Sequence, residues 1–364
     1  MDAKRNGEID LLRFVFAVII LIHHYNALFK LGIFEHGYIG VEFFFVVSGF
    51  LMARHAVRST VDSGDLNGIA DETWRYLTQR VRGFYAYYLL AAFLQVIVRY
   101  VIVTYIGKTR LMFGFLQSIP TFSLTFMGLN SSQTGLYVGN TWYLSSMLIA
   151  IFLLYPLLLR RRKFAAAVVF PAVALFVLGY LYAENSSVAV WENWSGLAYY
   201  GVLRAVGEMA LGASLFRLSC YLTEKRPRLL YADNRLAGIA VTFFKAFCFA
   251  VVIAFASGSI LGKPFERSFN LHALLWCALG ILLSFSDVGY SIPDSRVTRY
   301  LGKLSLPLFL FHGFIRWTVW EYIGHPISVK LFAGLVVMTV AVSIALMYLT
   351  DFLTAWLGAR RKKD

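Results

Sequence analysis

Apolar runs of about 20 residues recur along the whole chain and constrain its fold more than any other feature. An α-helix needs about 20 mainly apolar residues to cross roughly 30 Å of hydrocarbon. Runs of this kind lie at 11–29, 38–54, 84–106, 141–159, 164–184, 198–217, 236–257, 269–287, 300–322 and 329–356. Hydrophobic residues make up 59% of the 364 and charged residues 15%, against about 45–50% and about 25% in ordinary soluble domains. The sequence therefore predicts an all-α, polytopic integral membrane bundle of about ten transmembrane helices.

The basic residues are distributed unevenly between the loops. The net charge is +14, which in a soluble protein would suggest a nucleic-acid partner. Most lysines and arginines, however, stand in clusters between alternate apolar runs, as expected of cytoplasmic loops. This asymmetry predicts that both termini face the cytoplasm. No basic patch is interleaved with exposed aromatic residues, so we expect no nucleic-acid partner.

One further apolar stretch, 111–128, is interrupted by Pro120 and by several serine, threonine and glycine residues. If it crossed the membrane, every later loop would change sides and the charge asymmetry would be lost. We therefore expect this stretch to be interfacial or re-entrant, packed against protein. We also expect residues 1–364 to form a single transmembrane domain with no soluble domain and with a first span that is retained.

The cysteines and histidines do not suggest a metal centre. Cys220, Cys248 and Cys277 are far apart in or beside apolar runs, as buried small hydrophobic residues are. The seven histidines are scattered without metal-ligand spacing, so no metal site is expected. No glycine-rich phosphate loop occurs either, and no permanently bound cofactor is expected.

The first span carries two ionisable groups, which inside a bilayer are functional candidates by default. Arg13 and His24 are eleven residues apart, equivalent to about 16 Å of height and about 20° of rotation on an α-helix. One helix face therefore presents a cation near the cytoplasmic edge and an imidazole near mid-depth. An imidazole, with an unperturbed pKa of about 6.5, is a suitable general base. Alternatively, Arg13 is an interfacial anchor paired with Asp10 and His24 is a core histidine.

The second span begins with small residues and a carboxylate. Gly40, Ser48 and Gly49 allow another helix to approach closely. Glu42 is expected near the outer interface of the membrane. On physical grounds alone the segment indicates helix packing and one functional candidate.

The two spans together carry a specific pattern. It reads Asp10-x-x-Arg13-x10-His24 and then Gly37-x-x-Gly40-Val-x-Phe-Phe-Phe-Val-x-Ser48-Gly49-Phe. This pattern resembles the N-terminal signature of acyltransferase family 3, a large family of membrane proteins. Further similarity lies in Arg204-x3-Glu208-x3-Gly212 and in the segment 301–312 that ends at His312. The resemblance covers nearly all of the chain.

The resemblance implies an enzymatic function. Members transfer an acyl group, usually acetyl, from a cytoplasmic acyl-CoA to a hydroxyl of a cell-surface polysaccharide, lipopolysaccharide or related glycan, which can be lipid-linked. It therefore implies a bacterial inner-membrane O-acetyltransferase with acetyl-CoA, a glycan acceptor and membrane lipids as partners. It also implies that Arg13 and His24 form the catalytic pair. His24 would activate the acceptor hydroxyl or relay the acyl group, and Arg13 could hold the anionic donor, because guanidinium binds phosphate in a planar fork.

The chain departs from the family pattern before the third span. Many members have Arg-x-x-Arg-hydrophobic-x-Pro there, whereas this chain has Arg80 and Arg82, with Ala86 in place of the proline. Binding of CoA phosphates by Arg80 and Arg82 is one interpretation. Ordinary anchoring at the cytoplasmic interface is the other.

A second departure lies at the start of the fourth span. Many members read Trp-Ser-Leu-x-x-Glu, and here Met147 stands where the acid is expected. Trp142 and Tyr143 are expected at the outer interface, either in an aromatic belt or stacked on the acceptor sugar.

Three more residues are expected to support the site. Arg204 and Glu208 have the i,i+4 spacing that lets them neutralise one another, as a structural pair or as part of the acceptor site. His312 lies in the ninth span, where it could face the same cavity as His24.

Two other functions are compatible with the sequence. A transporter of an anionic or sugar-linked substrate would also carry intramembrane arginine and histidine, but no inverted repeat and no matching pair of broken helices is evident. A non-catalytic partner of a glycan synthase is supported only by the missing acid at Met147.

Overall fold

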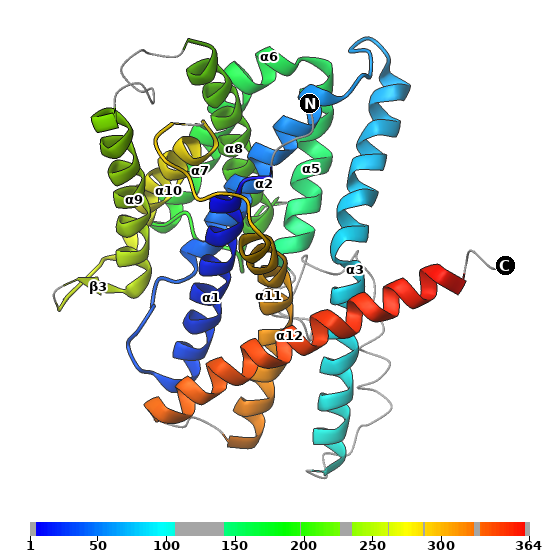
Figure 1. Ribbon diagram of the computed structural model, residues 1–364, viewed down its shortest axis with the longest axis vertical. Helices are drawn as coiled ribbons and strands as arrows, with labels where there is room; N and C mark the ends of the chain where they lie inside the picture. Colours follow the sequence, from blue (N-terminus) through cyan, green and yellow to red (C-terminus); the bar gives the residue numbers. More distant parts are fainter. Residues whose placement is uncertain are drawn as a thin grey trace.

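The computed structural model describes residues 5–105, 142–196, 198–225, 235–260, 262–286, 288–323 and 328–360. Helices form almost all of this part of the chain (Figure 1). They are α1 (Gly7–Phe29), α2 (Ile39–Arg58), α3 (Leu66–Tyr105), α5 (Trp142–Arg160), α6 (Arg162–Phe164), the π-helical turn Ala165–Val169, α7 (Phe170–Asn185), α8 (Tyr200–Lys225), α9 (Arg235–Ser257), the 3₁₀ turn Arg267–Phe269, α10 (Asn270–Phe285), α11 (Arg296–Ile323) and α12 (Val329–Arg360).

The strands are confined to two short antiparallel hairpins. β1 (Trp194–Ser195) pairs with β2 (Ala198–Tyr199), and β3 (Ser259–Ile260) pairs with β4 (Lys263–Pro264). Each hairpin stands between two long helices, so it acts as a connection and not as part of the core.

Within the described ranges, seven helical segments are long and apolar enough to cross a membrane. They include α1, α2, α5, α9 and α12, together with α6 to α7 and the 3₁₀ turn to α10. The prediction of an all-α polytopic membrane protein is confirmed. The other three expected spans fall on the long helices α3, α8 and α11, so the count of ten stays a prediction. The stretch 111–128 lies outside the described residues.

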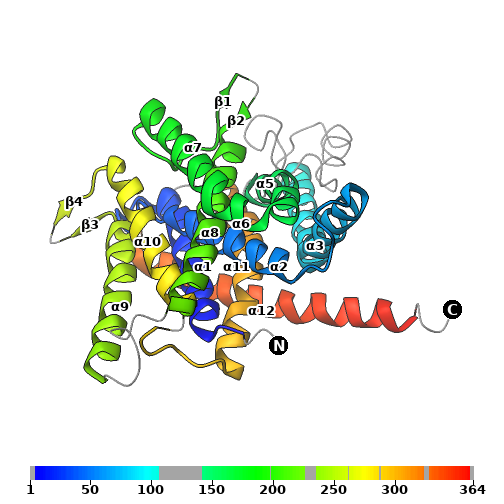
Figure 2. The same ribbon diagram turned by 90° about the horizontal axis from the view of Figure 1, so that it is seen from above.

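Four helices, α1, α2, α8 and α11, occupy the centre of the bundle when it is viewed from above (Figure 2). α1 packs along α11, and α2 packs along α8. α9 and α10 lie on one side, and α3 and α5 on the other. α12 crosses the bundle at a steep angle and projects beyond it (Figures 1 and 2). α1 and α11 are therefore neighbours, which places residues from the beginning and the end of the chain together.

Glycine explains the close crossing of α2 and α8. A Cβ on Gly49 would lie 2.0 Å from the carbonyl oxygen of Met209, and a Cβ on Gly212 would lie 2.0 Å from that of Val46. No larger side chain fits without moving one backbone away from the other. The expectation that small residues in the second span allow close packing is confirmed at this crossing.

The start of α1 is fixed by polar contacts. The side chain of Asn6 accepts a hydrogen bond from the Ile9 amide at 3.1 Å, which caps the helix. Glu8, in the first turn, pairs with Lys245 of α9 at 2.7 Å and accepts a hydrogen bond from Ser284 of α10 at 3.0 Å. The height of α1 is therefore set relative to two neighbours, and with it the position of Arg13.

Candidate functional site

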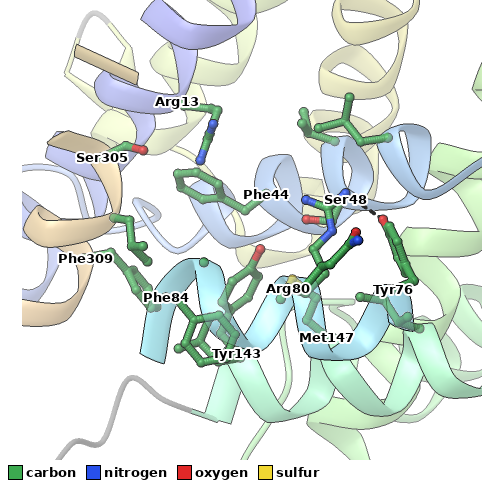
Figure 3. A pocket seen from close by; sticks show the side chains of 17 residues that line it. Arg13, Phe44, Ser48, Tyr76, Arg80, Phe84, Tyr143, Met147, Ser305 and Phe309 are labelled. Atoms are coloured by element: carbon green, nitrogen blue, oxygen red, sulfur yellow. Dashed lines mark hydrogen bonds between the residues drawn. The ribbon is translucent and has the colours of Figure 1, made fainter. Parts of the chain in front are cut away.

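A cavity of 260 Å³ lies where α1, α2, α3, α5 and α11 meet (Figure 3). Its walls are mainly aromatic and aliphatic, with a few polar groups that point inward. Its lining residues are Arg13, Phe44, Val47, Ser48, Leu51, Tyr76, Gln79, Arg80, Gly83, Phe84, Tyr143, Leu144, Met147, Ile151, Ser305, Leu306 and Phe309. An apolar cavity with a few polar groups that converge in it is the usual form of a small-molecule site.

Arg13 of α1 points into this cavity (Figure 3). Its Nη1 atom lies 3.7 Å from Oδ1 of Asp10, one turn earlier on the helix, and Asp10 also pairs with Arg5. The expected pairing of Arg13 with Asp10 is therefore present. Because the guanidinium is only partly buried and its contact with Asp10 is long, its other donors are available to a ligand.

The two arginines of α3 differ in position. Arg80 lines the cavity, where its Nη2 atom donates to the hydroxyl of Tyr76 at 2.6 Å and its guanidinium lies 4.8 Å from the centre of the Tyr76 ring. Arg82 is exposed and is not among the residues that line the cavity. The structure thus brings Arg80 and Arg13 to one cavity and leaves Arg82 outside it.

His24 and His312 form a hydrogen-bonded pair between α1 and α11. The Nε2 atom of His312 lies 2.9 Å from Nδ1 of His24, and the two rings stack with centroids 4.8 Å apart. The Nδ1 atom of His312 lies 2.9 Å from the carbonyl oxygen of Leu308. His312 and His24 are therefore direct neighbours, but neither is among the residues that line the cavity, so the expectation that both face one cavity stays a prediction.

These contacts fix where the protons lie when both imidazoles are neutral. A carbonyl oxygen only accepts, so Nδ1 of His312 carries its proton and Nε2 is a bare acceptor. Nδ1 of His24 must then donate, which leaves the lone pair of that ring on Nε2. The contact with His312 uses Nδ1 of His24, so Nε2 takes no part in it. The arrangement therefore presents one basic nitrogen.

Phe309 links the histidine pair to the cavity. Its ring lies 6.1 Å from that of His312 and 5.5 Å from that of Tyr143, and it forms part of the cavity wall. Arg13 therefore lies in the cavity wall, and the two histidines lie behind the ring of Phe309, outside the lining of the cavity. Ser305, one turn before Phe309 on α11, adds a hydroxyl to the wall.

Glu42, Arg204 and Glu208 form a buried cluster between α2 and α8. Arg204 lies 2.8 Å from Glu42 and 3.0 Å from Glu208, and all three side chains are buried. Asn270, at the start of α10, donates to Glu42 at 2.9 Å and accepts from the Val188 amide at 3.0 Å. The carboxylate of Glu42 is therefore enclosed by three helices, and its expected depth near the outer interface stays a prediction. The expected pairing of Arg204 with Glu208 is confirmed.

Trp142 and Tyr143 are also more enclosed than the sequence indicates. Trp142 stacks on Trp191 with centroids 5.3 Å apart and planes within 10°, and the guanidinium of Arg204 lies 5.5 Å from its ring centre. Tyr143 is buried in the cavity wall near Phe309. Both side chains are buried, so they do not form an aromatic belt that faces lipid, and their expected position at the outer interface stays a prediction. The packing of Trp142 does not support stacking on a sugar, because other side chains occupy that surface.

Ser48 and Met147 face the same cavity from α2 and α5. The position at which the resemblance implies an acid is therefore directed into the site, and in this chain it contributes the thioether of Met147. Gly49, next to Ser48, belongs to the crossing with α8 and not to the cavity wall.

Sequence reasoning missed several residues of these arrangements. Asn270 and Gln79 gave no signal, because a single asparagine or glutamine beside an apolar run is not distinctive. Phe309 and Ser305 could have been found, since they lie one and two turns before His312 on a helix and therefore share its face. Their link to the cavity depends on the pairing of α1 with α11.

Comparison with known proteins identifies the family of this chain. The family model of acyltransferase family 3, described as an acyltransferase domain, matches residues 6–348. No curated protein and no solved structure gives a significant match. The matched range includes the cavity and the His24–His312 pair, so the resemblance seen in the motifs is confirmed over nearly the whole chain. The chain therefore belongs to acyltransferase family 3 and is a membrane acyltransferase.

Proposed function

We propose that the protein transfers an acetyl group from acetyl-CoA to a hydroxyl of a cell-surface polysaccharide, lipopolysaccharide or related glycan, in the inner membrane of a bacterium. The donor would enter from the cytoplasm, on the side of Arg13 and Arg80, and both chain termini would face that side. Residues 1–364 would act as one transmembrane domain.

The observation that carries the proposal is the hydrogen-bonded pair of His24 and His312. At 2.9 Å, the contact leaves Nε2 of His24 with a lone pair inside the bundle. A fixed imidazole with one bare nitrogen can take a proton from an alcohol, or can itself attack a thioester. Both routes to acyl transfer require the lone pair at this nitrogen.

The simplest reaction is a direct transfer. The acceptor hydroxyl gives its proton to Nε2 of His24 as its oxygen attacks the thioester carbonyl. The carbon–sulfur bond then breaks, and the CoA thiolate takes the proton back from His24. Atoms and charges balance without any further reactant. In the relay route, Nε2 first accepts the acetyl group and then passes it to the acceptor oxygen.

The cavity supports a role for the arginines in donor binding. Arg13 and Arg80 reach the same space from α1 and α3, and much of the remaining wall is apolar. Guanidinium groups hold phosphate and polarised carbonyl oxygens well. An acyl group attached to an uncharged chain can pack against an apolar wall of this kind.

The experiment that tests the proposal measures transfer of labelled acetyl from acetyl-CoA to extractable glycans. Membrane vesicles from the native host would contain wild type, His24→Ala or His272→Ala at equal protein levels. His272 is an exposed imidazole that stacks on Phe269, so its variant is a matched control. We expect label in a glycan fraction with wild type and the control, and loss by a factor of about 10² or more with His24→Ala.

The result would distinguish the alternatives. Full transfer by a folded His24→Ala variant would remove His24 from the mechanism. If wild type transfers no label to any glycan although the acceptor is present, the proposed donor or acceptor is wrong. Analysis of the labelled fraction would identify the acceptor class.

A further inference from the structure

A second, wider cavity of 610 Å³ lies beside the first, between α1, α3 and α11. Five of its lining residues are cations, namely Arg5, Arg13, Arg296, Arg299 and Lys303, and none is an acid. They come from two helices and the segment before α1, which are far apart in the sequence. The positive charge therefore results from the fold and not from one basic run.

Three carboxylates next to the cavity balance part of this charge. Asp10 pairs with Arg5 and Arg13, Asp294 pairs with Arg299, and Asp351 of α12 pairs with Lys303. Five cations against three carboxylates leave a positive excess. Of the described residues, none forms an ion pair with Arg296, which is exposed at the cavity. An anion that entered the cavity would meet net attraction.

The carboxylates also orient the guanidinium groups. Nε and Nη2 of Arg299 donate to the two oxygens of Asp294 at 2.7 and 2.5 Å. That fork leaves Nη1 of Arg299 for another acceptor. Because the side chain is already held in place, little conformational entropy is lost when an anion binds.

The two cavities are adjacent, since Arg13, Gly83 and Leu306 line both. The wide cavity is basic, whereas the walls of the first include Phe84, Met147 and Phe309. Together they suit a long ligand with a strongly anionic end and an uncharged arm. The arm would lead past Arg13 toward Phe309, and thus toward the histidine pair.

We propose that the wide cavity binds the phosphate groups of the acyl-CoA donor, with Arg296, Arg299 and Lys303 as their main ligands. This inference rests on the proposed function and names the part of the chain that holds the anionic end of the donor. It gives the start of α11 a binding role beyond that of an interfacial anchor. Phosphate groups of anionic lipids have the same chemistry, so the test must separate the two sources.

The test compares CoA binding by the full-length protein in nanodiscs of phosphatidylcholine. The Arg296→Gln/Arg299→Gln variant removes two cavity charges. The Arg160→Gln/Arg161→Gln variant removes two exposed charges that do not line the cavity, and serves as the control. The ligands are CoA and its 3′-dephospho form, each titrated against labelled acetyl-CoA. We expect the first variant to bind CoA about tenfold or more weakly and to lose much of its preference over dephospho-CoA, and the control to match wild type.

Three outcomes would overturn the inference. If the cavity variant binds CoA as tightly as wild type, the phosphates lie elsewhere and the proposed function still stands. If the cavity variant binds CoA as tightly as wild type but retains less phosphatidylglycerol than wild type during purification from native membranes, the cavity is a site for lipid headgroups. If wild type itself does not bind CoA, the proposed donor fails, and this inference fails with it.

Discussion

Nε2 of His312 lies 2.9 Å from Nδ1 of His24, although the two residues are 288 positions apart in the chain. The contact joins α1 to α11, which pack along each other through the bundle. Since both side chains stand on long helices and not on loops, their relative position is set by helix packing. If His24 is the base, as proposed, it needs little reorganisation before it reacts.

Replacement of His312 by phenylalanine should slow acyl transfer without weakening donor binding. The substitution keeps a ring of similar size but removes the acceptor that orients His24. We expect kcat to fall about 10- to 100-fold and KM for acetyl-CoA to stay within a factor of about two, because the cavity cations are untouched. Steady-state kinetics in nanodiscs would measure both. His312→Gln, which keeps an acceptor oxygen, should retain more activity, and an unchanged kcat in the phenylalanine variant would contradict the positioning role.

Arg80 and Arg82 should differ in their effect on donor binding. Arg80→Gln removes a cation from the cavity wall and should raise KM for acetyl-CoA about tenfold. Arg82→Gln changes an exposed side chain and should raise it less than about twofold. The two positions are only two residues apart on the same helix. If both variants raise KM for acetyl-CoA equally, a position in the cavity wall does not determine which arginine contributes to donor binding.

Arg204→Met should destabilise the protein strongly. The substitution leaves the carboxylates of Glu42 and Glu208 buried without their cation. Loss of one partner from a buried ion pair costs about 3–5 kcal/mol. The midpoint of thermal unfolding in detergent should fall accordingly, and expression should drop.

A triple variant tests whether the charges of Glu42, Arg204 and Glu208 or the volume of their side chains determines the stability of the protein. Glu42→Gln/Arg204→Met/Glu208→Gln removes all three charges while it preserves most of the side-chain volume. We expect it to unfold at a higher temperature than Arg204→Met, because no unpaired charge is left. Equal midpoints would mean that the guanidinium stabilises the protein through its contact with Trp142 and not through the two carboxylates.

Gly49→Ala should weaken the crossing of α2 and α8, since the new Cβ would meet the backbone of Met209. The expected cost is about 1–3 kcal/mol. Gly179→Ala is a matched control on α7, where a Cβ would meet no atom within 4 Å. In a helix interior it should stabilise by about 0.5–1 kcal/mol. Thermal unfolding of both variants would measure the contrast, and a neutral Gly49→Ala would show that the helices separate easily.

Hydropathy and charge predict the helical membrane fold of this chain well. Each span must form its backbone hydrogen bonds within its own helix and must be apolar along about 20 residues. They do not predict which side chains neighbouring helices cover. Glu42 and Trp142, both expected near the outer interface, are covered by other helices. Which helix covers a given position depends on contacts such as that between Glu42 and Arg204, 162 positions later, which a single sequence does not reveal.

Residues on one helix were easier to relate than residues on different helices. The shared face of Arg204 and Glu208 follows from a spacing of four. The grouping of Arg13, Arg80 and Met147 around one cavity depends on how α1, α3 and α5 pack. The family resemblance supplied the candidates, and the structure adds which of them are neighbours.

The packing of α1 against α11 bears on how the protein is made. Chains are synthesised from the N-terminus, so α1 enters the membrane long before α11 leaves the ribosome. During that interval His24 and Asp10 cannot contact the helix that later covers them, and the proposed catalytic pair of His24 and His312 cannot form. Assembly of the active enzyme is therefore a late event in biosynthesis. A chain that stops before α11 should be inserted, but it should be open along one side, inactive and a substrate for membrane quality control.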